Sequence, residues 1–155
     1  MTAIYITCGE KILLLYRIGS RVVGNSYTGS AGGHIEAEEY RDPRACMLRE
    51  LQEETGLTED ALDGLKLRYI TMRRKDGEVR QNYYYFAELK DGASVNDSNE
   101  GRLEWHDMNA LGDLPMPVTA RHVVEHYLTV GCYDDKLYGG VTTAEGPVFA
   151  AMTDF

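Results

Sequence analysis

The sequence predicts an α+β fold in which a mixed β-sheet lies between helices. Strand-like runs occur near both ends of the chain and in its middle, two segments have helical patterns, and strands and helices do not alternate regularly. The chain has 155 residues, of which 43% are hydrophobic and 26% are charged, as is typical of globular proteins. We therefore expect residues 1–155 to form a single domain.

Two short strands are expected at the start of the chain. The runs 4–8 and 12–16 are rich in β-forming residues, and the turn 9–11 between them fits a hairpin. The next stretch, 18–34, contains five glycines, which predict a loop around one short strand.

The clearest helix signal lies between Pro43 and Thr55. Asp42 can cap the N-terminus, Pro43 is tolerated in a first helical turn, and Gly56 supplies a C-terminal stop. The remaining predicted elements also have regular patterns: a hairpin of 66–74 and 79–89 around the turn 75–78, a short strand at 103–107, an amphipathic helix at 119–130, and a final hairpin of 137–141 and 148–152.

The charge balance and the cysteines narrow the class of protein. Sixteen basic and 25 acidic residues give a net charge of −9, so we do not expect binding to nucleic acid. Cys8, Cys46 and Cys132 form no CxxC pair and are expected to be reduced packing residues. The N-terminus lacks a signal-peptide pattern and no apolar run is long enough to span a membrane, so we expect a cytoplasmic protein without a membrane partner.

Three carboxylates share one face of the helix predicted from Pro43. Glu50, Glu53 and Glu54 are spaced i, i+3 and i+4, which places them within about 100° of one another around the helix axis. Their mutual repulsion, near the negative end of the helix dipole, is unfavourable unless a cation binds there. Oxygen ligands suit Mg²⁺, with Mn²⁺ as the alternative. Taken alone, the same spacing is also typical of a solvated acidic face.

The residues around these acids resemble the Nudix box, G-x5-E-x7-R-E-U-x-E-E-x-G-U, where U is aliphatic. The matching residues are Gly33, Glu39, Arg49, Glu50, Leu51, Glu53, Glu54, Gly56 and Leu57. Two features depart from the pattern. Nine residues rather than seven separate Glu39 from Arg49, and Ala31 stands where many members have proline. We place the two extra residues within 39–42, ahead of the helix, where a longer loop leaves the acidic face unchanged.

The resemblance implies a Nudix-type α/β/α sandwich and the metal-dependent hydrolysis of a nucleoside diphosphate linked to another moiety, X. It implies that Glu50, Glu53 and Glu54 bind metal or act as base, and that the Gly33 carbonyl is a further ligand. Arg49 would orient a glutamate, so Glu53, Glu50 and Arg49 are the expected catalytic residues. A divalent ion held by carboxylates can bridge phosphate oxygens and activate a water molecule. The identity of the base and the number of ions stay open.

The resemblance also suggests site residues outside the box. Many family members add a carboxylate from a later loop, and Glu100 is the best-placed candidate, with Glu104 as the alternative. Arg17 ends the second predicted strand, where such chains often carry a base near the phosphates. Tyr27 precedes the paired glycines and is expected to border the substrate. Thr119 stands where MutT-type members can carry an asparagine that reads an oxidised purine.

Several functions remain open from the sequence. The chain looks like bacterial MutT-type members described as 8-oxo-dGTP diphosphatases, so a nucleoside triphosphate such as an oxidised dNTP is the expected substrate. ADP-ribose, a dinucleoside polyphosphate, and a non-catalytic nucleotide-binding role are the alternatives. The expected partner is this small-molecule nucleotide, and a homodimer is left open.

A second motif suggests a different enzyme. His122, Glu125 and His126 match H-x-x-E-H, a zinc-protease motif read in reverse order. The apolar spacing of the same segment already explains a packing helix, and no third ligand segment is evident. We therefore favour the nucleotide hydrolase.

Overall fold

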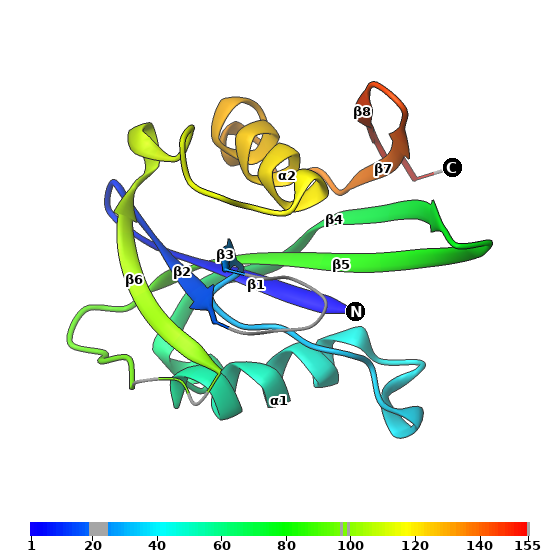
Figure 1. The fold of residues 1–155 in the computed structure, drawn as a ribbon. Coiled ribbons are helices and arrows are strands. Elements are labelled where there is room, and N and C mark those ends of the chain that lie inside the picture. Colours follow the sequence, from blue (N-terminus) through cyan, green and yellow to red (C-terminus); the bar gives the residue numbers. More distant parts are fainter. Residues whose placement is uncertain (19–24, 97, 99, 155) are drawn as a thin grey trace.

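The protein is described by a computed structural model that covers residues 1–18, 25–96, 98 and 100–154. Within these residues, eight strands form one mixed sheet with a long helix on each face, which confirms the predicted α+β class (Figure 1). The helices and strands are β1 (Thr2–Cys8), β2 (Lys11–Arg17), β3 (Ser26–Thr28), α1 (Pro43–Thr55), β4 (Leu62–Lys75), β5 (Glu78–Leu89), β6 (Gly101–Asp107), α2 (Val118–Thr129), β7 (Tyr138–Thr143) and β8 (Gly146–Ala151). Four 3-10 turns accompany them: η1 (Ala37–Glu39), η2 (Glu59–Ala61), η3 (Met108–Ala110) and η4 (Gly131–Tyr133).

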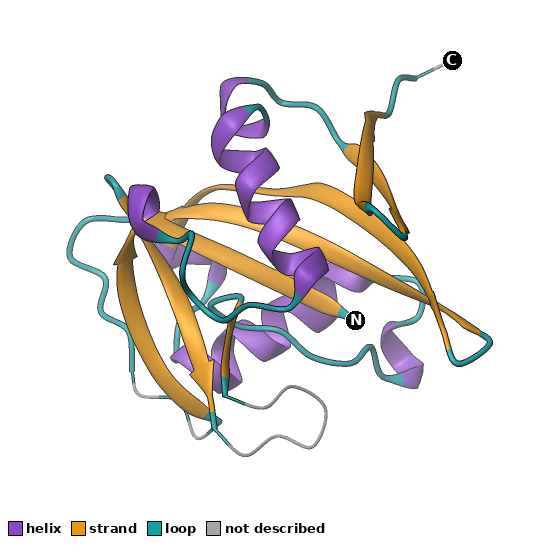
Figure 2. Ribbon diagram, turned by 45° about the horizontal axis from the view of Figure 1, so that its top comes forward, coloured by secondary structure: helices purple, strands orange, loops and turns teal. Residues whose placement is uncertain are grey.

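The sheet joins parallel and antiparallel pairs. Its order is β3-β2-β1-β5-β4-β7-β8, and β6 pairs with β2. β1 runs parallel to β5, and β4 runs parallel to β7, whereas the other pairs are antiparallel. The β7–β8 hairpin extends the sheet at the end opposite to β6 (Figure 2).

Local sequence signals account for most element boundaries. Helix α1 spans the predicted residues, with Oδ1 of Asp42 accepting the amide hydrogens of Arg44 and Ala45, each at 3.1 Å. Gly56 ends the helix with a φ of 73°. The β4–β5 turn is also as predicted, because Asp76 and Gly77 both have positive φ.

Strand β4 starts earlier than the sequence predicts. It begins at Leu62 rather than at 66, and its pairing with β5 shifts register between Asp63 and Lys66 and again between Leu67 and Tyr69. Such irregularities interrupt the alternation of apolar and polar residues on which the prediction rested. The predicted loop 18–34 contains β3, and residues 19–24 lie outside the described part of the chain.

Two apolar cores hold the helices against the sheet. Successive residues of β1 belong to different cores: Ile4 and Ile6 pack on the α1 side, and Tyr5 packs on the α2 side. Met47 and Leu51 bring α1 into the first core, where both are fully buried. The segment that carries the acids is thereby fixed against the sheet.

One expectation about the cysteines is wrong. Cys46 is buried in α1, but Cys8 and Cys132 are exposed, and all three are free thiols. Cys8 ends a hairpin strand and Cys132 lies in a 3-10 turn, so neither reaches a core. Across the described residues, no helix is long and apolar enough to cross a membrane.

The cap of α1 can be tested through stability. Asp42→Ala should lower the free energy of unfolding by about 1 kcal/mol, because two amide hydrogens of the first turn lose their acceptor. For a chain of this size the melting temperature should fall by about 2–4 °C in a thermal melt. Asp42→Asn retains a side-chain oxygen and serves as the control. An equal loss in both variants would contradict the capping role.

Candidate functional site

The loop that leaves β3 folds back along β1 and meets α1. The amide of Ile4 donates to the carbonyl of Ala31, and the amide of Thr2 donates to the carbonyl of Gly33, each at 2.9 Å. Ser30 is fully buried and joins this loop to both strands of the first hairpin, since its hydroxyl donates to Leu13 at 2.7 Å and accepts from Ile6 at 2.8 Å. The paired glycines are therefore held beside the acidic face of the helix.

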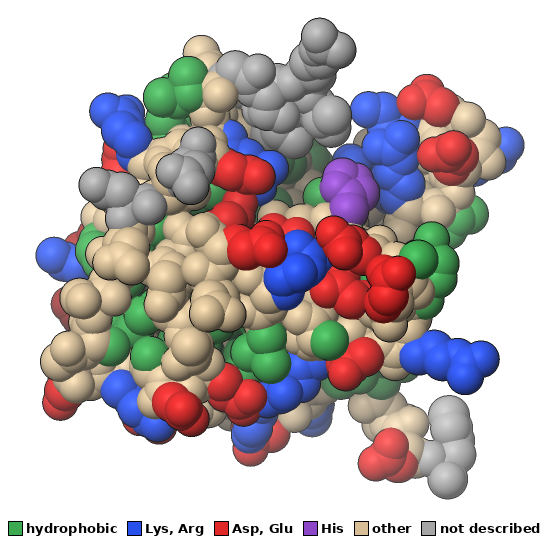
Figure 3. Space-filling model, turned by 90° about the horizontal axis from the view of Figure 1, so that it is seen from below, with side chains coloured by type: hydrophobic (Ala, Val, Ile, Leu, Met, Phe, Trp, Pro, Cys, Tyr) green, Lys and Arg blue, Asp and Glu red, His purple; other side chains and the backbone are tan. Residues whose placement is uncertain are grey.

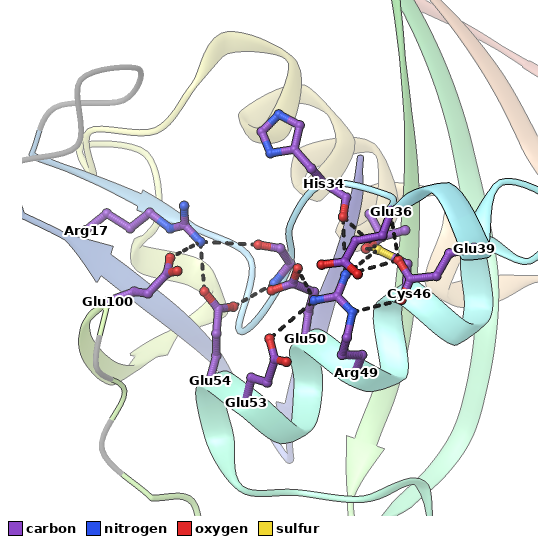
Figure 4. A network of polar contacts seen from close by, with 12 residues as sticks. Arg17, His34, Glu36, Glu39, Cys46, Arg49, Glu50, Glu53, Glu54 and Glu100 are labelled. Carbon is purple, nitrogen blue, oxygen red and sulfur yellow. Dashed lines mark hydrogen bonds and ion pairs between the residues drawn. The ribbon is translucent and has the colours of Figure 1, made fainter.

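The three acids of α1 differ in exposure. The side chain of Glu54 is 3% exposed, that of Glu50 is 13% exposed, and that of Glu53 is 59% exposed. Oε2 of Glu54 accepts the amide hydrogen of Gly32 at 2.7 Å, so Glu54 is the acid that ties the helix to the loop (Figure 4). The same face of the molecule gathers acidic side chains with basic ones beside them (Figure 3).

Close contacts surround both glycines, with the backbone of Thr2 at Gly32 and with the flexible side chain of Glu50 at Gly33. A Cβ at Gly33 would collide with the carboxylate of Glu50, and a Cβ at Gly32 would collide with the backbone carbonyl of Thr2. The glycine pair therefore lets the loop approach both the helix and β1, which brings backbone carbonyls close to the carboxylates.

Arg49 connects three glutamates. Its guanidinium pairs with both oxygens of Glu39, at 2.8 Å through Nε and 3.0 Å through Nη2. Its Nη1 donates to Glu50 at 2.8 Å and to Glu53 at 3.2 Å. These hydrogen bonds, chiefly from Arg49, lower the pKa of Glu39 to about 2. The longer link ahead of α1 includes η1, and Glu39, at the end of that turn, still reaches Arg49.

Arg17 makes a second bridge, from β2. Its Nη2 lies 2.7 Å from Oε1 of Glu54 and 2.7 Å from Oε2 of Glu100, and it donates to the carbonyl of Gly32 at 3.2 Å. Burial raises the pKa of Glu54 to about 7, although the amide of Gly32 and the charge of Arg17 oppose the rise. Glu54 therefore depends on a neighbouring cation to stay ionised at neutral pH.

The donors at this site fit a divalent cation such as Mg²⁺. Four carboxylates from Glu50, Glu53, Glu54 and Glu100, with glycine carbonyls beside them, are the hard oxygen ligands that such ions prefer. In the described part of the chain, no three acidic, histidine or cysteine side chains converge as a metal cluster. The reason is visible in the contacts, because guanidinium groups lie between the carboxylates and neutralise them.

Other predicted site residues lie apart from these acids. The hydroxyl of Tyr27 donates to Glu104 at 2.7 Å, and Tyr27 packs in the core on the α2 side. Thr119 is buried at the start of α2, with its hydroxyl 3.5 Å from that of Thr142. Of the two acids predicted to lie in a loop, Glu104 is within β6, and it is Glu100, just before β6, that reaches the α1 site, through Arg17.

The histidines of the H-x-x-E-H segment have other partners. Nδ1 of His126 lies 2.8 Å from the hydroxyl of Tyr69, and the imidazole packs edge-on against that ring. His122 contacts Glu125 at 3.3 Å. These contacts support the packing interpretation of the helix.

Two features of the site were missed in the sequence. The amide and carbonyl of Gly32 contact Glu54 and Arg17, and the thiol of Cys46 lies 3.7 Å from Nη2 of Arg49. The paired glycines were a signal for the first feature, and the i, i+3 spacing of Cys46 and Arg49 on one helix was a signal for the second.

Comparisons with known proteins identify relatives of this chain. A family model described as the NUDIX domain matches residues 2–127. The uncharacterised Nudix hydrolase YvcI of Bacillus subtilis is 30% identical over 122 residues, which cover 75% of this chain and 70% of that protein.

Solved structures have a similar fold. An Ap4A hydrolase of C. elegans superposes with a TM-score of 0.66 and 17% identity, over 86% of this chain and 96% of that one. The MutT protein of Bacillus halodurans gives a TM-score of 0.63 and 21% identity, over 97% and 95% of the two chains. At these identities the likeness shows the fold alone.

The Glu39–Arg49 pair should appear in the pH dependence of stability. The pKa of Glu39 is lowered from 4.5 to about 2 by folding, so its stabilising effect is complete above pH 4.5 and is lost as the pH falls towards 2. Glu39→Gln should therefore lower the melting temperature at pH 7, and the difference from the wild type should shrink below pH 4.5.

Glu38→Gln is the matched control, since Glu38 is an exposed neighbour in the same turn. Thermal melts from pH 3 to pH 7 measure both variants. A pH-independent difference for Glu39→Gln, or the same profile for Glu38→Gln, would contradict the assignment.

Proposed function

The chain belongs to the Nudix family, and from that premise we propose that it is a divalent-metal-dependent pyrophosphohydrolase that cleaves the diphosphate linkage of a nucleoside diphosphate linked to X. Membership of this hydrolase family makes it an enzyme that acts on pyrophosphate bonds. Nudix hydrolases generally use divalent metal ions, and we propose Mg²⁺ here, with Mn²⁺ as the alternative.

One observation carries the proposal. Four carboxylates from two distant segments, α1 and the loop before β6, meet beside a glycine pair, and among the described residues Arg17 and Arg49 are the cations paired with them. Glu54 and Glu50 are largely buried, and negative charge concentrated in this way is unfavourable in a purely structural site. It is the arrangement expected where a divalent ion binds and then attracts an anionic substrate.

The roles of the residues follow from their contacts. We assign Glu54, Glu100 and the carbonyl of Gly33 to metal binding, and proton removal from water to the pair Glu50 and Glu53. When bound, the metal ion would neutralise phosphate charge and lower the pKa of a water ligand.

The two arginines have different roles in this proposal. Because Nη1 of Arg49 donates to both Glu50 and Glu53, Arg49 fixes the separation of the two carboxylates. With a metal ion held by Glu54 and Glu100, the guanidinium of Arg17 would no longer pair with these carboxylates and would be free to contact a phosphate oxygen.

The substrate is proposed at the level of its chemistry. Nucleoside triphosphates, such as an oxidised dNTP, are the first class to test, and ADP-ribose and dinucleoside polyphosphates are the alternatives. Structural relatives bear the names MutT and Ap4A hydrolase, which supports testing both kinds of nucleotide. Thr119 offers a hydroxyl where an asparagine would read an oxidised purine, which disfavours oxidised guanine.

Loss of one carboxylate should abolish most of the activity. Glu53→Gln and Glu50→Gln should each lower kcat by about 100-fold or more with Mg²⁺, because the site loses a group that binds metal or removes a proton. Chelation of divalent ions should have at least the same effect on the wild type. The release of nucleoside monophosphate, followed by chromatography against a panel of nucleotides, measures both.

Glu59→Gln is the control, since Glu59 pairs with Arg44 and belongs to η2 rather than to the acidic face. Undiminished hydrolysis in excess chelator, or in both site variants, would contradict the proposed function.

A further inference from the structure

The β4–β5 hairpin carries two arginines that face each other. Arg73 and Arg80 are cross-strand partners in the antiparallel pair, so their side chains leave the same face of the sheet. Like charges in this arrangement disfavour folding. In the described part of the chain, Arg80 has a single ion pair, to Glu78 at 3.6 Å, and Nε of Arg73 is buried without a hydrogen-bond partner. Within the described residues, few negatively charged groups therefore compensate the two arginines.

Polar groups continue along the same face of the hairpin. The hydroxyl of Tyr84 accepts a hydrogen bond from Asn82 at 3.4 Å. Burial raises the pKa of Tyr84, and the nearby guanidinium of Arg73 opposes the rise. Tyr5 stacks with Tyr84, and its fully buried hydroxyl has no hydrogen-bond partner among the described residues. Of these groups, Nε of Arg73 belongs to a partly exposed side chain, and an oxygen atom of a ligand would satisfy it.

The arginines leave the α2 side of the sheet, as Tyr84 of the same face does, whereas the acids lie on the α1 side. Along the strands, the arginines are at the end of the sheet where the glycine loop runs. Gly33 pairs with Thr2, and Thr2 is the partner of Tyr83 in β5, so β1 begins between the two segments. Strand β5 starts at Glu78, upstream of that point, and therefore extends past the start of β1. The loop and β5 are two interstrand spacings apart, with β1 between them. Arg80 is three residues upstream of Tyr83 along β5. Together, these two separations place the Cα of Arg80 about 14 Å from the Cα of Gly33.

We propose that Arg73 and Arg80 bind a phosphate group that the substrate carries beyond the cleaved diphosphate. This inference rests on the proposed function and selects, within that class, substrates with such a group, as in a dinucleoside polyphosphate or a nucleotide phosphorylated on its ribose. Guanidinium groups bind phosphate through paired charge-assisted hydrogen bonds. In a molecule with a net charge of −9, a local pair of arginines supplies the attraction that the overall charge does not.

Binding without catalysis gives the first test. Inorganic tripolyphosphate is titrated into the protein by calorimetry in excess chelator, so that no metal site contributes. The wild type should bind, and Arg73→Gln and Arg80→Gln should each weaken binding by about 10-fold, the effect of losing one charge-assisted contact. Arg74→Gln is the matched control, because it removes the same charge from the opposite face of β4. Absence of wild-type binding, or equal weakening in the control, would overturn the proposal.

Kinetics provide the second test and distinguish the two sources of the phosphate. ADP-ribose is compared with its 2′-phosphate in one arm and with diadenosine tetraphosphate in the other. At least one phosphate-bearing member should have a lower KM than ADP-ribose in the wild type, and Arg73→Gln and Arg80→Gln should remove that advantage while kcat stays within about twofold. If the two variants changed KM equally for all three substrates, the arginines would not be specific for the additional phosphate group, which would contradict the proposal. If no substrate is cleaved but tripolyphosphate binding depends on the arginines, the proposed function fails and the anion site stands.

The melting temperatures of the two variants show whether the arginines bind a ligand or stabilise the hairpin. Since the arginines repel each other, Arg73→Gln and Arg80→Gln should leave the melting temperature unchanged or raise it. A fall of several degrees in both variants would indicate that the pair holds the hairpin together, and would count against the proposal.

Discussion

Pairing of five glutamates with two arginines, among the residues that the structure describes, is the interaction on which the rest of this site depends. Glu54 is almost fully buried, and burial raises its pKa to about 7, so it depends on a cation in contact to stay ionised at neutral pH. Arg17 supplies that cation from β2, and Arg49 pairs with Glu50 from within the acidic helix. Because Nη2 of Arg17 contacts both Glu54 and Glu100, it lies where a divalent ion bound by both carboxylates would lie.

The fold maintains this charge arrangement by bringing the glycine loop close to α1 and β1. Residues without a Cβ at 32 and 33 let the loop pass between the helix and β1, and the buried hydroxyl of Ser30 fixes the loop to the first hairpin. Met47 and Leu51 anchor the opposite side of α1 in the core. The acidic face is thereby held on a packed helix, and Glu100 comes from the segment just before β6.

Local signals made most of the fold predictable. The α1 boundaries followed from Asp42, Pro43 and Gly56, because caps and stops act over a few residues. The start of β4 could not be predicted in this way, because register shifts in its pairing with β5 break the alternating pattern of apolar and polar residues. Within the site, the helix spacing placed three acids on one face, but the bridge from Arg17 to Glu54 and Glu100 joins three distant segments and depends on the assembled sheet. The exposure of Cys8 and Cys132 was missed for the same reason, since burial is set by packing rather than by residue type.

The affinity of the metal-free protein for Mn²⁺, titrated by electron paramagnetic resonance, tests the central claim most directly. If Arg17 competes with the ion for Glu54 and Glu100, Arg17→Met should bind Mn²⁺ about 10-fold more tightly than the wild type, and Arg17→Lys should fall between the two. The measurement needs no substrate and no turnover. Unchanged or weaker binding in a folded Arg17→Met variant would show that the guanidinium does not occupy the cation's place, and would contradict the account.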